Sequence, residues 1–145
     1  MKSDYYVASV VNAYRRALDG FDDMEALKNE LEKTSHRRYT TGFYFGANDK
    51  EYLGDSMPVQ TAVFVAKVVE DAKDGLVKVE MRNRFKVGDK LEVLSADDNF
   101  LKVITIEDIT NSKGETIDDA KRVQEIVTIN CPFTLKAGDI LRTNK

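Results

Sequence analysis

The chain has 145 residues, a net charge of −3, 42% hydrophobic residues and 32% charged residues, a composition that excludes a disordered or membrane-embedded chain. Its longest apolar run, residues 62–69, is interrupted by Lys67 and is too short to span a bilayer. One cysteine excludes an internal disulfide, and with one histidine it leaves no nitrogen–sulfur ligand set for zinc or an iron–sulfur cluster. We therefore expect a cytoplasmic protein with no membrane contact, no bound metal and no cofactor.

Two amphipathic helices are predicted at the start of the chain. Residues 4–19 carry apolar side chains at three- and four-residue spacing, and Ser3 or Asp4 can cap the first turn. Residues 22–34 repeat the pattern, with Asp22 at a capping position. Two short helices cannot bury both of their own apolar faces, so we expect the stripe of the first helix to dock on another domain. The docking residues expected on that stripe are Val7, Val10, Val11 and Tyr14.

After Gly46 the sequence changes to strand periodicity. Apolar and polar residues alternate most clearly over residues 76–81. Short strands separated by turn sequences, with no long helix between them, favour a closed antiparallel six-stranded β-barrel of the translation-factor kind. The predicted fold is therefore mainly β, with a helical hairpin over residues 1–35 and a barrel over residues 36–145. The six expected strands are 60–70, 76–81, 90–94, 100–109, 125–130 and 140–143.

A short repeat marks two of the predicted turns. Residues 86–89 read Lys-Val-Gly-Asp and residues 136–139 read Lys-Ala-Gly-Asp, and each run leads into an expected strand. Glycine permits a positive φ, and the aspartate can accept hydrogen bonds from the backbone amides of the turn. We interpret both runs as hairpin corners rather than as functional motifs.

Motifs that carry catalytic chemistry are absent from the sequence. It has no Gly-x-Ser-x-Gly, no His-Glu-x-x-His and no glycine-rich phosphate or dinucleotide loop. The acid pairs Asp97-Asp98 and Asp118-Asp119 lie in turn-like polar contexts, where carboxylates are solvated rather than tuned for acid–base work. Cys131 lies in an apolar stretch and is interpreted as a buried thiol. These observations predict a non-catalytic module.

Uneven charge points to two candidate binding segments. Residues 82–90 carry four basic side chains and one acid, whereas residues 91–120 carry eight acids and two lysines. On a strand, Arg82 and Arg84 would point to one face, as a phosphate-tracking pair requires, and residues 35–46 add cations with aromatic rings for base stacking. Alternatively, the rings belong to the core and the arginines pair with the acids of residues 91–120. The candidate substrate- or RNA-binding residues are His36, Arg37, Arg38, Tyr39, Phe43, Tyr44, Arg82, Arg84 and Lys86.

Three ordered segments resemble the C-terminal part of peptidase family U32, the collagenase-like proteins. Residues 5–15 are similar to its YYVA…AYR helix, residues 35–43 to its SHR.YTTGF segment and residues 79–89 to its VE.RNRF..GD strand and turn. The resemblance covers almost the whole chain. It implies a C-terminal β-barrel that follows a larger catalytic domain, a TIM-type barrel, with the first helix as the end of the connection between them.

The resemblance also implies a class of activity for the parent protein. Family members were named peptidases or collagenases, and several are associated with hydroxylation of RNA bases, including 5-hydroxyuridine at the tRNA wobble position with prephenate as co-reactant. The catalytic and cysteine-ligand residues of that group belong to the upstream part, so the resemblance assigns neither activity to residues of this chain.

Three functions stay open at this point. The leading hypothesis is an accessory domain that helps the upstream catalytic domain of the same protein to hold RNA, with tRNA as the expected partner. Phosphate-dominated binding of this kind weakens steeply with salt. The second is recognition of protein substrates for a collagenase-like protease, which predicts an exposed apolar or aromatic groove. The third is a structural domain that docks on the catalytic domain and stabilises it.

Overall fold

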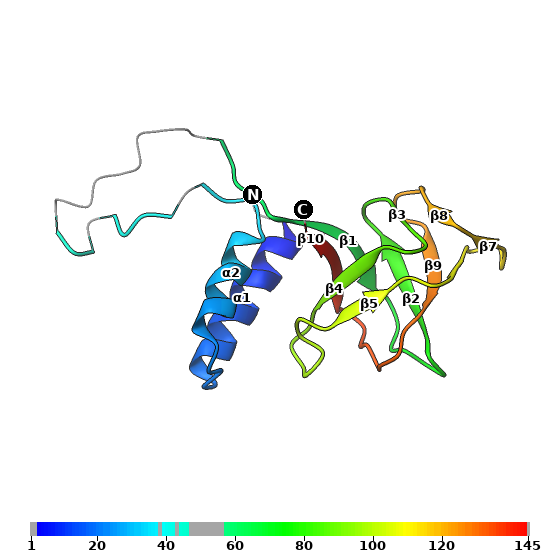
Figure 1. Cartoon of the computed structure of the whole chain (residues 1–145), viewed down its shortest axis with the longest axis horizontal. Coiled ribbons are helices and arrows are strands. Elements are labelled where there is room, and N and C mark those ends of the chain that lie inside the picture. Colours follow the sequence, from blue (N-terminus) through cyan, green and yellow to red (C-terminus); the bar gives the residue numbers. More distant parts are fainter. Residues whose placement is uncertain (1–2, 38, 43, 47–56, 145) are drawn as a thin grey trace. The chain divides into compact units, whose positions relative to one another are not determined.

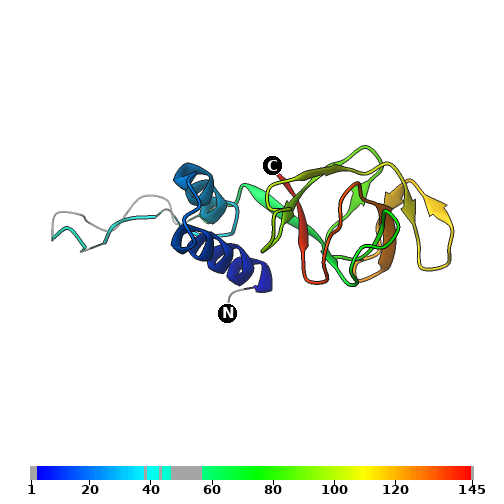
Figure 2. The same ribbon diagram turned by 90° about the horizontal axis from the view of Figure 1, so that it is seen from below.

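The computed structural model describes residues 3–37, 39–42, 44–46 and 57–144. The chain forms two compact units, residues 1–61 and residues 62–145. The first unit holds both helices and the second holds all the strands that the described residues form (Figures 1 and 2). None of the described helices is both long enough and apolar enough to cross a membrane.

The helical unit is a hairpin of α1 (Asp4–Leu18) and α2 (Met24–Glu32), which pack side by side as the periodicity predicts (Figure 1). The Ser3 hydroxyl caps α1 by accepting a hydrogen bond from the Tyr6 amide at 3.2 Å. Asp23, one residue after the expected position, caps α2 through the Ala26 amide at 2.9 Å. Each cap satisfies a backbone donor that has no partner within its helix.

The β unit contains short strands with antiparallel pairing throughout. The strands of the described residues are β1 (Ala62–Val68), β2 (Leu76–Met81), β3 (Phe85–Lys86), β4 (Lys90–Leu94), β5 (Val103–Thr105), β6 (Ile109–Thr110), β7 (Thr116–Ile117), β8 (Asp119–Ala120), β9 (Ile126–Asn130) and β10 (Ile140–Asn144). Eight of them form one sheet in the order β5-β4-β10-β1-β2-β9-β6-β7, while β3 and β8 form a separate two-stranded ribbon.

The mainly β fold with helices at its start is confirmed, but the closed six-stranded barrel is wrong. The eight-stranded sheet curls into a half-barrel whose hydrogen-bonded order ends at β5 and β7 (Figure 2). The expected strand over residues 100–109 divides into β5 and β6, which lie far apart in the strand order. Between them, Ile106 bonds to a turn instead of a strand: its amide donates to the Asp89 carbonyl at 2.9 Å and its carbonyl accepts from Gly88 at 2.8 Å. These bonds continue the β4–β5 pairing by one residue, and beyond Ile106 the chain leaves β4 and pairs with β9 through Ile109.

The core of the β unit follows the predicted alternation. In β2, Val77, Val79 and Met81 are buried while Lys78 is exposed, because successive side chains point to opposite faces of a strand. The curled sheet encloses these side chains with those of the other strands. The largest apolar members of this core include Phe85, Leu91, Ile104, Ile106, Ile109, Ile129, Leu135 and Leu141.

The two Lys-x-Gly-Asp runs form matching turns, as predicted. The Asp89 carboxylate accepts a hydrogen bond from the Lys86 amide at 2.9 Å, and Asp139 accepts one from the Lys136 amide at the same distance. Gly88 and Gly138 have φ values of +92° and +99°, a region that side-chain-bearing residues rarely adopt. The glycine and the aspartate therefore act together to turn the chain into β4 and into β10.

Candidate nucleic-acid interface

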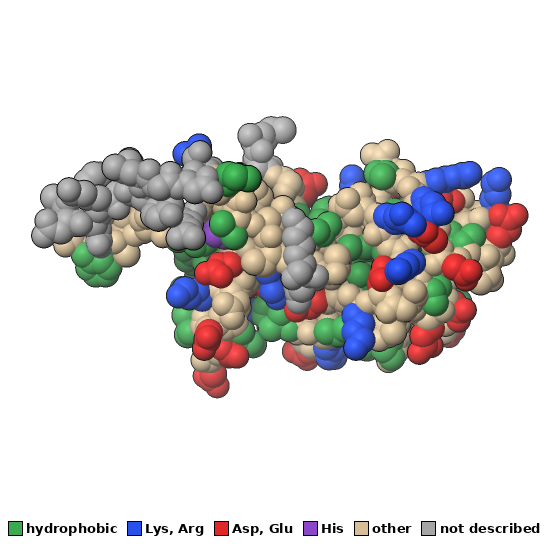
Figure 3. All heavy atoms as spheres, turned by 45° about the horizontal axis from the view of Figure 1, so that its top comes forward, with side chains coloured by type: hydrophobic (Ala, Val, Ile, Leu, Met, Phe, Trp, Pro, Cys, Tyr) green, Lys and Arg blue, Asp and Glu red, His purple; other side chains and the backbone are tan. Residues whose placement is uncertain are grey.

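The ribbon of β3 and β8 has one buried face and one charged face. Phe85 pairs with Ala120 and both are buried, whereas the next pair, Lys86 and Asp119, lies on the opposite face. Continuing the register places Arg84 opposite Lys121. The outer face of the ribbon therefore carries Arg84, Lys86 and Lys121 around a single acid, Asp119. Figure 3 shows cationic side chains gathered with acids on the surface of the β unit.

Asp119 holds two of these cations. The Arg84 guanidinium donates from Nε to Oδ1 at 2.9 Å and from Nη2 to Oδ2 at 2.5 Å, and the Lys121 ammonium lies 3.4 Å from the same Oδ2. The hydrogen bonds from Arg84, supported by Lys121, keep the pKa of the Asp119 carboxyl below its usual value, and Asp119 raises the pKa of Arg84. Both shifts favour the charged forms of Arg84 and Asp119.

Arg82 is not part of the β3–β8 ribbon. It lies in the bend after β2, where its amide donates to the Val65 carbonyl at 2.7 Å, so the two-residue spacing of a strand does not apply. Its guanidinium pairs with Glu80 at 3.0 Å and lies 6.0 Å from the centre of the Phe64 ring. The two arginines are thus held by different acids. One of these acids, Asp119, belongs to residues 91–120, where the alternative interpretation expects the partners of both arginines.

Sequence reasoning missed Lys121 and its neighbour Arg122, which is also exposed. The available signal was the Lys121-Arg122 pair, which follows Asp118-Asp119 after one alanine, but the two acids cancel its charge when charge is summed along the sequence. Pairing of β3 with β8 brings Lys121 next to Arg84 from a distant part of the sequence. The cationic face of the ribbon is therefore a product of strand pairing.

The candidate residues of the helical unit divide into structural and exposed groups. His36 is buried: its backbone pairs with Val59 at 3.1 and 2.8 Å, and its ring stacks on Tyr39 with centroids 4.1 Å apart. The Tyr39 hydroxyl donates to the Leu31 carbonyl at 3.1 Å, and partial burial, followed by Tyr6 and Glu32, raises the pKa of Tyr39. Both rings therefore support the local structure.

Arg37 and Tyr44 are exposed, and so is Tyr39, at 55%, although its hydroxyl bonds to the backbone. Tyr44 is 85% exposed and meets the Phe45 ring edge to face at 5.0 Å. Arg38 and Phe43 lie outside the described residues. The exposed aromatics belong to the helical unit, and the ribbon belongs to the β unit.

The expected docking stripe of α1 points to solvent. Val7, Val11 and Tyr14 are 51%, 52% and 62% exposed, and Val10 is half-buried. The side chains that α1 buries are Tyr5, Ser9 and Ala13. Tyr14 also borders a groove of about 230 Å³ between the helices, whose other lining residues are Ala13, Ala17, Met24, Leu27, Lys28 and Leu31. The helix thus exposes Val7, Val11 and Tyr14 while it buries Ser9 and Ala13 together with Tyr5.

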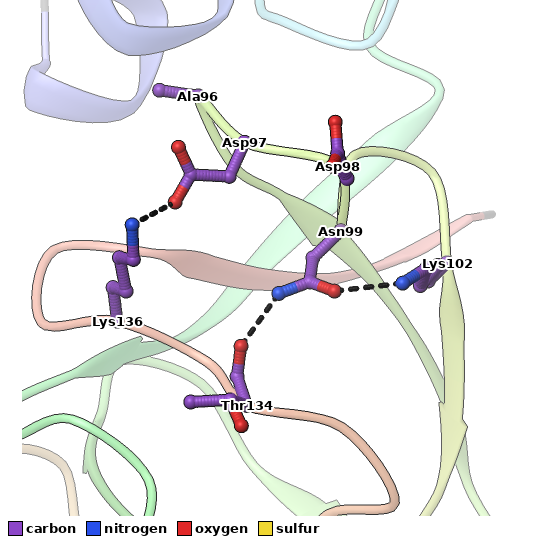
Figure 4. Close-up of a pocket in the computed structure, with 7 residues that line it drawn as sticks. All are labelled: Ala96, Asp97, Asp98, Asn99, Lys102, Thr134 and Lys136. Carbon is purple, nitrogen blue, oxygen red and sulfur yellow. Dashed lines mark hydrogen bonds and ion pairs between the residues drawn. The ribbon is translucent and has the colours of Figure 1, made fainter.

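A wider groove of about 590 Å³ lies in the β unit between the turn after β4 and the loop before β10 (Figure 4). Asp97 pairs with Lys136 at 2.7 Å, and Asn99 donates to the Thr134 carbonyl at 2.6 Å while accepting from Lys102 at 2.9 Å. Figure 4 shows that Asp97 points toward Lys136 and that Asn99 points toward Thr134 across the groove. Their contacts connect the two loops to each other.

The candidate residues for nucleophilic or metal chemistry are Cys131 and the acidic side chains. Cys131 is buried, as expected, and donates to the Phe133 carbonyl at 2.8 Å, and burial raises the pKa of its thiol. No three His, Cys, Asp or Glu side chains within the described part of the chain come together as a set of metal ligands.

Family models divide the chain near the boundary between the two units. The model described as peptidase family U32 matches residues 1–54, and the model described as the peptidase family U32 C-terminal domain matches residues 60–142. The chain belongs to peptidase family U32. Both units of this U32 protein are therefore parts of known family modules, and the resemblance of the three sequence segments is confirmed.

Curated relatives of this U32 protein include two tRNA hydroxylation proteins. The chain is 30% identical to tRNA hydroxylation protein P1 of Bacillus subtilis, covering 100% of this chain and 36% of that protein. It is 31% identical to tRNA hydroxylation protein P of Haemophilus influenzae, covering 99% of this chain and 34% of that protein. The chain thus spans about a third of the length of the curated relatives it matches.

A solved structure matches the β unit of the U32 protein. The C-terminal domain of a Geobacillus thermoleovorans U32 protein superposes with a TM-score of 0.51 at 25% identity, covering 56% of this chain and 92% of that one. The likeness supports the mainly β fold of the second unit.

Proposed function

We propose that this chain is a non-catalytic accessory part of a tRNA-modifying U32 protein and that it helps to hold the RNA substrate. The observation that carries the proposal is the outer face of the β3–β8 ribbon, where Arg84, Lys86 and Lys121 surround one acid. The names of the curated relatives point to tRNA as the RNA concerned.

The chemistry of this face suits a phosphate backbone. Arginine offers a planar fork that matches two oxygens of a phosphate, and lysine adds a strongly hydrated point charge. The Arg84 and Lys121 side chains are 67% and 65% exposed, so an RNA strand can reach them without displacing the core. Tyr44, on the helical unit, offers an exposed ring for base stacking.

Fluorescence anisotropy of a labelled tRNA at two salt concentrations tests the proposal. We expect affinity to fall as salt rises, and Arg84→Glu with Lys86→Glu to weaken binding at least about tenfold. The same change should make the dependence of log affinity on log salt shallower by about 0.7 to 0.9 for each phosphate that is no longer neutralised. Lys73→Glu is the control, because Lys73 is exposed and lies beyond the opposite end of β2. Binding that ignores salt, or that responds equally to both changes, would contradict the proposal.

A second function, docking on the upstream part of the same protein, is favoured by α1. A helix that exposes Val7, Val11 and Tyr14 while burying Ser9 leaves apolar area in water, which costs free energy unless another surface covers it. The occupant we propose is the remainder of the U32 module, because the relatives are about three times as long and the U32 model matches the helical unit. The groove beside Tyr14 would extend this contact.

Titration calorimetry of this chain against the separate upstream part of the same U32 protein tests docking. Val7→Glu with Val11→Glu should abolish association while the circular dichroism of the helices is unchanged. Arg15→Glu is the control, since Arg15 is an exposed polar residue of the same helix. Association that survives the paired change would exclude this face. A gain of binding to a protein substrate instead of the upstream part would favour the protease-type alternative.

A further inference from the structure

Asp119 occupies the position that an anion would take on the ribbon. Its two oxygens accept both donors of the Arg84 fork, at 2.9 and 2.5 Å, and the oxygen at 2.5 Å is also the one nearest Lys121. One carboxylate oxygen thus contacts both cations, and the other oxygen contacts the same guanidinium. Arginine and lysine bind the oxygens of a phosphate in the same arrangement. The carboxylate therefore fills a site whose donors suit phosphate oxygens equally well.

The contact is also easily exchanged. The Arg84 side chain is 67% exposed, and ion pairs of exposed side chains contribute little to stability because water competes for both partners. Asp119 is fixed by the pairing of β8 with β3, whereas Arg84 is a long side chain that can turn to another anion. Separating them leaves Arg84 in water, and Asp119, whose side chain is 22% exposed, keeps the Lys121 ammonium at 3.4 Å, so neither becomes an unpaired buried charge.

We propose that Asp119 is an internal competitor, which holds the Arg84 fork in the free chain and yields it to an RNA phosphate. This inference rests on the proposed RNA-binding function. Exchange would leave Asp119 with Lys121 and place the phosphate on Arg84 and Lys86. The adjacent carboxylate repels any bound phosphate, so isolated or weakly held anions are rejected. A strand of RNA that contacts several cations at once overcomes this repulsion.

Substitution of two neighbouring acids separates this effect from a general change in charge. Asp119→Asn removes the competitor and keeps the shape of the side chain. Asp118→Asn removes the same charge one residue earlier, where the side chain is exposed and the backbone carbonyl bonds to the Val87 amide at 2.9 Å. We expect Asp119→Asn to raise affinity for labelled tRNA about three- to tenfold and Asp118→Asn to raise it less.

Adding Arg84→Lys to Asp119→Asn should remove most of the gain, because lysine keeps the charge but lacks the fork. Equal gains for the two asparagine variants, or weaker binding by Asp119→Asn with an unchanged melting temperature, would overturn the competitor while leaving RNA binding intact. If wild type and every variant fail to bind tRNA, the proposed function itself fails and the inference falls with it. The two failures are therefore distinguishable.

Discussion

Arg142 is fully buried in β10, where it pairs with a carboxylate. Antiparallel pairing places it opposite Glu92 of β4, whose Oε1 accepts from Nε at 2.9 Å and from Nη2 at 2.6 Å. Arginine is rarely buried without a partner, so the sequence alone favours an exposed position for it. Strand register, which brings residues 92 and 142 together, decides the outcome.

Removing one member of this pair should destabilise the β unit. Arg142→Ala leaves Glu92 without this partner, and breaking a buried pair in this way costs about 3–5 kcal/mol of unfolding free energy. Arg142→Met with Glu92→Leu replaces the whole pair with apolar groups and should cost much less. Urea denaturation followed by circular dichroism measures both. If the single and the paired change lower the free energy of unfolding equally, loss of one partner of the ion pair is not the cause of the destabilisation.

At the scale of elements, the two Lys-x-Gly-Asp turns differ in burial although their hydrogen bonds match. Asp139 is 8% exposed, whereas Asp89 is only partly buried. Both carboxylates accept the amide of the lysine three residues earlier. When the Asp139 carboxylate is removed, water replaces it at the Lys136 amide less easily than water replaces the Asp89 carboxylate at the Lys86 amide.

The same substitution in the two turns should therefore have unequal effects. We expect Asp139→Ala to lower the free energy of unfolding by about 0.5–1.5 kcal/mol, the net contribution of one hydrogen bond, and Asp89→Ala, whose hydrogen bond is exposed, to lower it by less. Thermal and urea unfolding of the two variants compare them directly. A larger loss at Asp89 would mean that burial does not control the contribution of these turns.

The helices and strands also show which elements the spacing of apolar residues predicts correctly. The helices and β2 carry regular apolar spacing and lie where the pattern predicts them. Residues 100–109 also carry an apolar pattern but divide into β5 and β6, because Val103–Thr105 pair with β4 whereas Ile109–Thr110 pair with β9. Periodicity describes which face of a segment is buried, and it contains no information about which backbone will pair with it.

At the scale of the whole molecule, the chain is two compact units with distinct matches. The helical unit matches the U32 model and the β unit matches the C-terminal-domain model and a solved domain of nearly the same extent. The hydrophobic core defined by the buried strands lies within residues 65–141. A core of this kind is sufficient for independent folding of a domain.

Residues 62–145 expressed alone should therefore fold. We expect the fragment to keep the β-type circular dichroism spectrum and a single cooperative thermal transition, because the buried core side chains all lie within it. A β fragment without a cooperative transition would mean that the helical unit contributes to its stability.

The amino-acid sequence by itself determined the helices, the strands β1, β2, β4, β9 and β10, the two glycine–aspartate turns and the family, because each depends on local pattern. The tertiary structure alone decided that the sheet stays open, that β3 pairs with β8, that Arg82 and Arg84 bind different acids and that Lys121 joins Arg84 around Asp119. These features depend on backbone pairing between distant segments. Such pairing is selected by the free energy of the whole packed core, which no local stretch of sequence contains.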